Sequence, residues 1–227
     1  MVPSEGVMKN MHPLIEIYNN YGQKDEAVVS NELVCKIFSR ISNTPGRTSA
    51  SIAKTLGIDP KTVEWHLKKL IDANVVVQNS QKNKYWLKGV LNENELIYMD
   101  ALSSDASAII VNQLIEKGRL SLNGLEDVNR NTAHRKIKLL ENVGLVSETK
   151  SGREIFVHLN EKFFVFKEKL RTRMNIFTVT YLRRLKLSKV GFEIIGMSEF
   201  DLTIMTDYGF PIILSRDPVF TVLKYAK

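Results

Sequence analysis

The sequence predicts a mainly helical α+β protein in which small β-hairpins follow groups of short helices. Apolar residues recur every three or four positions over most of the chain, which indicates amphipathic helices. Two short stretches rich in β-branched and aromatic residues, around 75–88 and 145–158, are each interrupted by a polar, basic tip and so predict hairpins. The second stretch repeats the pattern of the first, which indicates two related units.

Composition narrows the class of partner. The chain has 227 residues, a net charge of +7 and a pI near 9.4, which favours a polyanionic partner such as nucleic acid or an acidic membrane surface. The excess of basic residues lies between Arg47 and Lys189, which favours a localised binding surface. One cysteine, Cys35, makes neither a disulfide framework nor a metal cluster. No apolar run approaches the ~20 residues of a membrane span. We therefore expect a cytoplasmic protein with no cofactor, metal or membrane contact.

Residues 1–30 form a weakly patterned leader, and the first helical group follows it. A helix is expected from a cap at Asn31 to Asn43, and a second over 51–56, closed by Gly57. Asp59 caps a third helix that begins at Pro60, where the missing N–H costs nothing. Asn74 ends that helix in the left-handed conformation. Helix, helix, glycine-containing turn and helix is the order of a helix-turn-helix unit.

A hairpin follows at 75–78 and 84–88, with the polar tip 79–83 between its strands. Such a hairpin after a helix-turn-helix is called a wing. Residues 31–90 are therefore predicted to form a first winged-helix domain.

The pattern recurs further along the chain. Residues 59–88 align without a gap on 129–158, with a helix expected at 106–116 and a shortened second helix at 122–128. This predicts a second winged-helix domain over 104–160, in tandem with the first and joined to it by a helical linker, 91–103.

The remaining chain is less specific. Residues 161–189 have an apolar stripe and basic residues on other faces, typical of a long amphipathic helix, although β-branched residues at 175–181 allow a break. The stripe fits either dimerisation or packing against the second winged helix. Residues 190–227 alternate like short strands and end in a helix, 218–225, capped by Asp217. We expect a small α/β tail and assign it no role.

The segment Ser49–Lys88 resembles the DNA-binding domain of prokaryotic winged-helix regulators of the ArsR and MarR kind. The run Thr62–Leu70 is especially similar to archaeal members, and Thr132–Val146 resembles the same pattern. The resemblance implies that the third helix of each domain enters the major groove of double-stranded DNA, while the wing reaches phosphates or the minor groove. The metal-binding cysteines of ArsR sensors have no counterpart here.

Carried onto this chain, the resemblance implies two sets of DNA-contacting residues. Lysines of such a set contact phosphates, whereas Thr62 and Glu64 reach base edges; Arg130 or Arg135 suits a guanine edge and Asn131 an adenine. Trp65 either lies along the DNA backbone or packs against the second domain or a partner. The full first set is Arg47, Ser49, Lys61, Thr62, Glu64, Trp65, Lys68 and Lys69, with Gln81, Lys82 and Lys84 on its wing; the second is Arg130, Asn131, His134, Arg135 and Lys138, with Lys150 and Arg153 on its wing.

Other reactive residues have simpler interpretations. His66 precedes a core leucine and is expected to pack rather than to act as a switch, and Cys35 is expected in the core. His134 and His158 lack partners at metal-ligand spacing. The chain contains no glycine-rich phosphate loop, nucleophile elbow or His-Glu-X-X-His helix, so we expect no enzyme.

Two functions fit these expectations. The first is a DNA-binding transcription regulator that acts as a homodimer, formed through the helix 163–185 or through the tail, on a palindromic site. The second is a tandem winged-helix adaptor that binds proteins in chromosome organisation or transcription initiation. The basic outer faces of both third helices favour the first, and exposed Trp65 favours the second.

Overall fold

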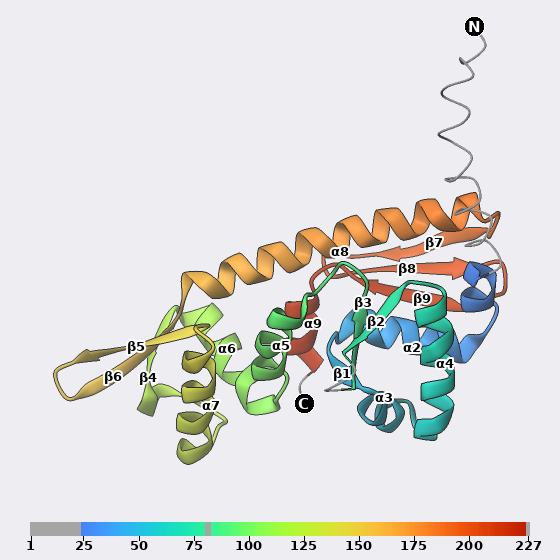
Figure 1. Ribbon diagram of the computed structural model, residues 1–227. Coiled ribbons are helices and arrows are strands. Elements are labelled where there is room, and N and C mark those ends of the chain that lie inside the picture. The colour runs from blue at the N-terminus through green and yellow to red at the C-terminus, as the bar shows by residue number, and fades with distance from the viewer. Residues whose placement is uncertain (1–23, 80–82, 226–227) are drawn as a thin grey trace, which may run out of the picture.

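The computed structural model describes residues 24–79 and 83–225. Its helices and strands form two small units and a tail sheet, connected by one long helix (Figure 1). In the described residues, no helix is both long and apolar enough to cross a membrane. The leader up to residue 23 and the predicted wing residues Gln81 and Lys82 lie outside the described residues.

The first unit has the helix order that the sequence predicts. Its elements are α2 (Glu32–Asn43), β1 (Arg47–Thr48), α3 (Ser49–Leu56), α4 (Pro60–Asp72), β2 (Val76–Asn79) and β3 (Lys84–Leu87), with the sheet order β1-β3-β2. The expected caps are confirmed: Asn31 accepts from the backbone N–H of Val34, and Asp59 accepts from those of Lys61 and Thr62. Asn74 has the left-handed φ of 60° expected after α4. The two-residue strand β1 was not predicted.

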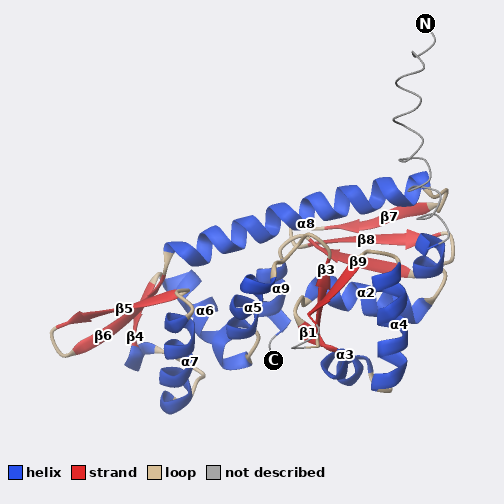
Figure 2. Ribbon diagram, viewed as in Figure 1, coloured by secondary structure: helices blue, strands red, loops and turns tan. Residues whose placement is uncertain are grey.

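The next unit has the same order of strands. It comprises η1 (Glu93–Glu95), α5 (Leu96–Leu102), α6 (Asp105–Lys117), β4 (Arg119–Ser121), η2 (Leu122–Gly124), α7 (Arg130–Asn142), β5 (Val146–Ser151) and β6 (Glu154–Leu159), with the sheet order β4-β6-β5. The hairpin β5–β6 extends well beyond the rest of the molecule (Figure 2).

One expectation for this unit is wrong. The shortened helix expected at 122–128 is a single 3₁₀ turn, η2, held by the Ser121 hydroxyl, which accepts from the N–H of Gly124. Asp127 then has a φ of 59°, which an α-helix cannot continue through. The backbone geometry of these few residues, rather than their hydrophobic pattern, limits the helix.

The long helix α8 (Glu161–Leu187) is continuous, so the break allowed at 175–181 does not occur. Its 27 residues span about 40 Å at 1.5 Å per residue. Phe177 and Tyr181 pack against Phe38 of α2, with ring centroids 6.2 and 5.1 Å away, and this tertiary contact outweighs the weak helix propensity of the segment. Helix α8 thereby links the hairpin β5–β6 to the first unit (Figure 1).

The tail forms a separate antiparallel sheet and a last helix. Strands β7 (Phe192–Met197), β8 (Asp201–Thr206) and β9 (Pro211–Ser215) pair in sequence order, and α9 (Pro218–Tyr225) follows. Asp217 accepts from the N–H of Phe220, which confirms the expected cap. The outer edge of β9 faces α2: the N–H groups of Ile213 and Ser215 donate to the hydroxyls of Ser39 and Ser42, at 2.9 and 2.8 Å. The tail sheet is therefore joined directly to the first helix of the first unit.

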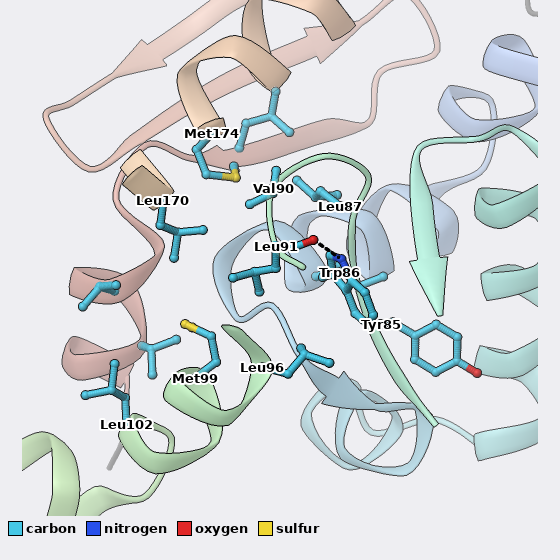
Figure 3. Packing of buried hydrophobic residues seen from close by; sticks show 14 of the residues in the cluster. Tyr85, Trp86, Leu87, Val90, Leu91, Leu96, Met99, Leu102, Leu170 and Met174 are labelled. Carbon is cyan, nitrogen blue, oxygen red and sulfur yellow. Dashed lines mark hydrogen bonds between the residues drawn. The ribbon is translucent and has the colours of Figure 1, made fainter. Parts of the chain in front are cut away.

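The buried side chains form one connected core. Trp86 and Leu87 of β3 meet Leu96 and Met99 of α5, and Met174 of α8 closes this region from above (Figure 3). The indole N–H of Trp86 donates to the carbonyl of Leu91 at 2.8 Å, so its polar group is satisfied inside the core.

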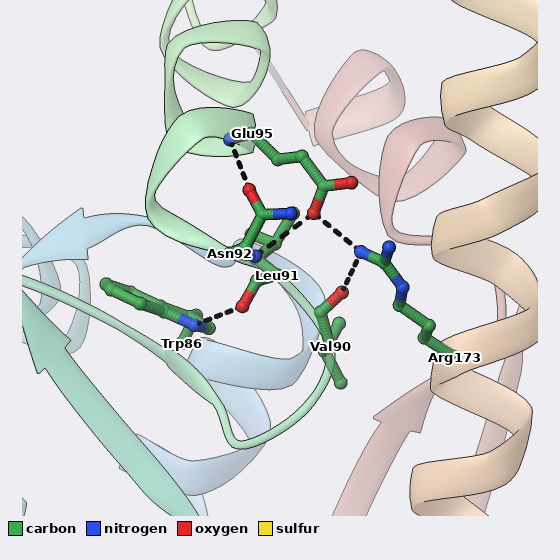
Figure 4. Close-up of polar contacts among 6 residues, drawn as sticks. All are labelled: Trp86, Val90, Leu91, Asn92, Glu95 and Arg173. Carbon is green, nitrogen blue, oxygen red and sulfur yellow. Dashed lines mark hydrogen bonds and ion pairs between the residues drawn. The ribbon is translucent and has the colours of Figure 1, made fainter.

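A polar network holds the loop after β3 against α8 (Figure 4). Arg173 of α8 donates to the carboxylate of Glu95 at 2.5 Å and to the carbonyl of Val90 at 3.3 Å. Glu95 also accepts from the N–H of Asn92, in a capping box that starts η1. These contacts fix the connection between the two units.

Candidate nucleic-acid interface

Helix α4 has one buried face and one exposed face. Val63, Leu67 and Leu70 are at most 1% exposed and pack on the core. The opposite side presents four exposed side chains, of Lys61, Thr62, Trp65 and Lys68, and the partly exposed Lys69. Because the apolar positions recur at helical spacing, packing of the inner face alone orients the basic face outward.

Trp65 is 58% exposed, unusually high for the largest apolar side chain. The ammonium group of Lys69 lies 3.7 Å from the centre of its ring, and the His66 ring lies 4.7 Å away, edge-on. Burial first, and then the positive charge of Lys69, lower the pKa of His66. Because more than half of the Trp65 side chain is exposed, its indole surface is available to a partner and does not pack against the second unit.

Ser49 and Glu64 have internal roles. Ser49 is 2% exposed and donates to the carboxylate of Glu64 at 3.0 Å. Asn83 of the wing donates to the Ser49 hydroxyl and accepts from the hydroxyl of Tyr85. Ser49 is therefore not on the surface expected to contact DNA, because its hydroxyl ties α3 to α4 and to the wing. Glu64 is exposed but shares this network.

Two further basic residues of the first set contact α5. Lys84 of β3 forms an ion pair with Asp100, and the Lys84 side chain is 17% exposed. Arg47 of β1 donates to the carbonyl of Ser103 at 3.4 Å. These contacts leave α4 as the most accessible basic surface of the first unit.

Helix α7 repeats the division of faces seen in α4. Ala133, Ile137 and Leu140 are at most 2% exposed, and the opposite face exposes a group of polar and basic residues. The members of that group are Arg130, Asn131, His134 and Arg135. Lys150 and Arg153 are exposed at the end of the extended hairpin.

Lys138 differs from the other predicted contacts. Its ammonium group lies 2.7 Å from the carboxylate of Glu141 and 3.0 Å from that of Glu148. Both carboxylates raise the pKa of Lys138, Glu141 most strongly. Two anions thus neutralise this cation locally, so Lys138 adds little to a positive surface.

Sequence analysis missed Arg119 of β4. It is exposed, and its guanidinium lies 4.1 Å from the centre of the Phe156 ring on the neighbouring strand β6. The signal in the sequence was weak: Arg119 follows Gly118 just after the end of α6, outside both third helices and both expected hairpins. Strand pairing between 119 and 158 brings it beside the second hairpin.

Metal chemistry has no support in this surface. Across residues 24–79 and 83–225, no group of three or more histidine, cysteine or acidic side chains is arranged to hold a metal ion. Cys35 is buried, and burial raises the pKa of its thiol to about 12.

Comparison with known families identifies the first unit. A family described as winged helix-turn-helix DNA-binding matches residues 30–77, which include α2, α3 and α4. The chain therefore contains a winged helix-turn-helix DNA-binding domain.

The chain is also similar to one protein described as a regulator and to several solved structures. The chain is 26% identical over 147 residues to an uncharacterized HTH-type transcriptional regulator of Methanocaldococcus jannaschii; the match covers 63% of this chain and 37% of that protein. The chain thus spans little more than a third of the relative's length. Among solved structures, IdeR of T. acidophilum matches with 13% identity, 83% of this chain, 93% of that chain and a TM-score of 0.22. ScaR with bound Zn²⁺ matches with 17% identity, coverage of 82% and 94%, and a TM-score of 0.21. Scores this low carry no structural argument.

Proposed function

We propose that this protein is a transcription regulator that binds double-stranded DNA with α4 in the major groove. The observation that carries the proposal is the exposed basic face of α4, within a domain of the winged helix-turn-helix DNA-binding family. Lys61 and Lys68 contact phosphates, while Thr62 is placed to reach a base edge. Trp65 lies along the sugar-phosphate backbone, with the Lys69 ammonium group beside it.

We further propose that the second unit is a second winged helix, related to the ArsR and MarR kind like the first. The support is the shared strand order: in each unit the strand that follows the first long helix, β1 after α2 and β4 after α6, pairs with the last strand of the hairpin, β3 or β6. Arg130, Asn131 and Arg135 of α7 are its base-reading candidates. Helices α4 and α7 both lie below α8 in Figure 1, although the end of α4 contacts α8 through Arg184.

The dimer interface cannot be the apolar stripe of α8. Phe163, Phe166, Leu170, Met174, Tyr181 and Leu185 of that stripe are at most 4% exposed, so they pack within the chain. The expectation that 161–189 dimerises through this stripe is corrected accordingly. Of the two interpretations considered from sequence, intramolecular packing accounts for it, with α2 among its partners.

We propose instead that two copies pair through strand β7. One edge of the tail sheet, β9, is covered by α2, whereas β7 is the opposite edge strand. Ile194, Ile195 and Met197 of β7 are 52%, 49% and 72% exposed, and an open apolar edge strand is a template for pairing with another chain. Antiparallel pairing of β7 with its copy is self-complementary about a two-fold axis, which gives the symmetry of a palindromic site.

A salt series tests the DNA proposal. Binding of a random-sequence duplex is measured by fluorescence anisotropy between about 50 and 200 mM salt. Each phosphate contact contributes about 0.9 to the slope of log affinity against log salt, so Lys61→Ala with Lys68→Ala should lower the slope by about 1.8. Lys36→Ala is the matched control, because Lys36 lies on α2 and pairs with Glu32. Absence of binding at the lowest salt contradicts the regulator and favours the adaptor. An unchanged slope contradicts the placement of α4.

Dimerisation has its own test. Sedimentation of the wild type should show a dimer, and Ile194→Lys with Ile195→Lys should shift it to monomer while the monomer stays folded by circular dichroism. Ile176→Lys on α8, 62% exposed, is the control. A dimer that survives the β7 substitutions would place the interface elsewhere.

A further inference from the structure

A cavity of about 180 Å³ lies where the tail meets the first unit. Its wall combines side chains of α2, β8, β9 and α9. The cavity is separate from the exposed faces of α4 and α7, and no residue assigned to DNA binding lines it. It is smaller than the ~300–1,000 Å³ of pockets for drug-sized ligands, so its occupant is a small molecule.

Arg40 gives the cavity an anion-binding side. Its Nε atom is buried and has no hydrogen-bond partner, and its Nη2 atom makes only a long bond of 3.4 Å to the hydroxyl of Thr55. No carboxylate of the described chain pairs with Arg40. Burial, and then the positive charge of nearby Arg47, lower its pKa. A guanidinium has five N–H donors, so most of those of Arg40 remain available.

Two other side chains with N–H donors lie on the cavity wall with Arg40. Asn43 lies almost one turn further along α2, and the cation Lys224 comes from α9. A carboxylate bound here would therefore meet donors from both elements. Asp201 is the only acidic side chain of the wall, and its carboxylate already accepts from the hydroxyl of Ser198 at 3.0 Å.

Apart from Thr203 and Thr221, the rest of the wall is aromatic and apolar. Phe200 and Phe220 stack almost parallel, with centroids 3.7 Å apart and an angle of 11° between the rings, and Ile213 adds an aliphatic surface. An inorganic anion would bind to Arg40 and leave this apolar wall unused. A ligand that joins a planar apolar ring to an anionic group would contact both the basic side chains and the apolar wall.

We propose that this cavity binds a small organic carboxylate with an aromatic body, its carboxylate on Arg40 and Lys224 and its ring against the phenylalanines. The site itself does not depend on the DNA proposal. A ligand bound to Arg40 would compete with the hydrogen bond from Arg40 to Thr55 of α3, so ligand binding could shift α3 and alter DNA binding. This effect on DNA binding, unlike the site itself, rests on the proposed function.

Calorimetric titration of the full chain without DNA tests the site, with benzoate, benzamide and inorganic phosphate as probes. Benzoate should bind at least tenfold tighter than neutral benzamide and than phosphate. Arg40→Gln should weaken benzoate at least tenfold, since charge-assisted bonds to guanidinium are lost, and Lys224→Gln should weaken it several-fold. Lys54→Gln, an exposed charge change on α3, should leave binding unchanged.

Three outcomes would contradict the proposal that this cavity binds an aromatic carboxylate. Failure of benzoate to saturate the wild type contradicts it, and so does equal binding by phosphate. Equal affinity in the Arg40→Gln and Lys54→Gln variants also contradicts it, provided that thermal melting shows both folded. DNA binding that persists in all these cases shows that the proposed function stands while the ligand site fails.

Discussion

The ion pair between Asp25 and Arg184 provides the sharpest test of what holds α8 in place. The Asp25 side chain is fully buried; it accepts from Arg184 Nε at 2.6 Å and from the hydroxyl of Ser188 at 3.0 Å, and also pairs with Arg184 Nη2. The same Nη2 donates to the carbonyl of Ala73 after α4, at 2.6 Å. One guanidinium thus connects the chain before α2, the end of α4 and the end of α8.

Replacing Arg184 with methionine keeps an unbranched, flexible side chain, shorter than that of arginine, and removes the charge. Asp25 would then be a buried carboxylate with Ser188 as its remaining donor, and the Ala73 carbonyl would lose a partner. Removal of one member of a buried ion pair lowers the free energy of unfolding by about 3–5 kcal/mol, because the other charge is left uncompensated. Urea denaturation at about pH 7.5 measures this loss.

The loss should depend on pH in a defined direction. Burial raises the pKa of Asp25, while Arg184 and then Ser188 oppose that shift, so removal of Arg184 raises the pKa further. A folded state with a raised carboxyl pKa binds a proton more readily than the unfolded chain, so its stability falls as pH rises from the unfolded pKa to the folded one. The loss caused by Arg184→Met should therefore be smaller at about pH 5 than at pH 7.5.

Two comparisons make this reasoning refutable. Arg183→Met changes an exposed neighbour on α8 and should cost less than about 0.5 kcal/mol. Adding Asp25→Asn to Arg184→Met should restore part of the stability, since it removes the buried charge. A loss below about 1 kcal/mol for Arg184→Met, or one that is the same at both pH values, would refute the argument.

Three further predictions follow from buried or constrained residues. His66 has a lowered pKa, so its contribution to stability is fully present above about pH 6.5 and is lost as pH falls from that value through the lower pKa of the folded state; His66→Gln should flatten that part of the stability–pH curve measured in urea. The thiol of Cys35, with a pKa near 12, should not react with a disulfide reagent at neutral pH until guanidinium unfolds the chain; rapid reaction of the native protein contradicts its burial. Gly46→Ala should lower stability more than Gly89→Ala does. Both glycines have positive φ, which costs an alanine about 1–2 kcal/mol, but only at Gly46 would the new Cβ also lie 3.2 Å from the side chain of Leu96. Equal losses in thermal melts would show that this contact with Leu96 costs nothing.

The features predicted from sequence are those decided by near neighbours. The caps at Asn31, Asp59 and Asp217 involve residues within three positions of the capping side chain, so the sequence contains the whole interaction. The outward face of α4 likewise follows from the spacing of three apolar residues. These local rules extend to the hairpin after α4, although its tip lies partly outside the described residues.

The features that escaped prediction depend on distant partners. Lys84 appeared as a wing cation, but its neighbour in space is Asp100 of α5. Ser49 looked like an exposed residue at a helix start, yet the tertiary position of Glu64 and Asn83 draws it inside. Strand β1 has two residues, too few for any periodicity, and forms only because β3 supplies its partner. Pairings between separated segments decide which predicted contacts remain accessible.

The hydrogen bonds between α2 and β9 also have a consequence for folding during synthesis on the ribosome. Ser39 and Ile213 are separated by 174 residues, and Ser42 and Ser215 by 173. At about 5–20 residues per second, synthesis of the intervening chain takes roughly 10 to 35 s. Throughout that time the face of α2 that will meet β9 has no partner. Contacts so distant in sequence are slow to form, so the first unit should emerge early yet mature last. Nascent chains arrested before β9 should consequently be far more sensitive to protease in α2 than the released protein.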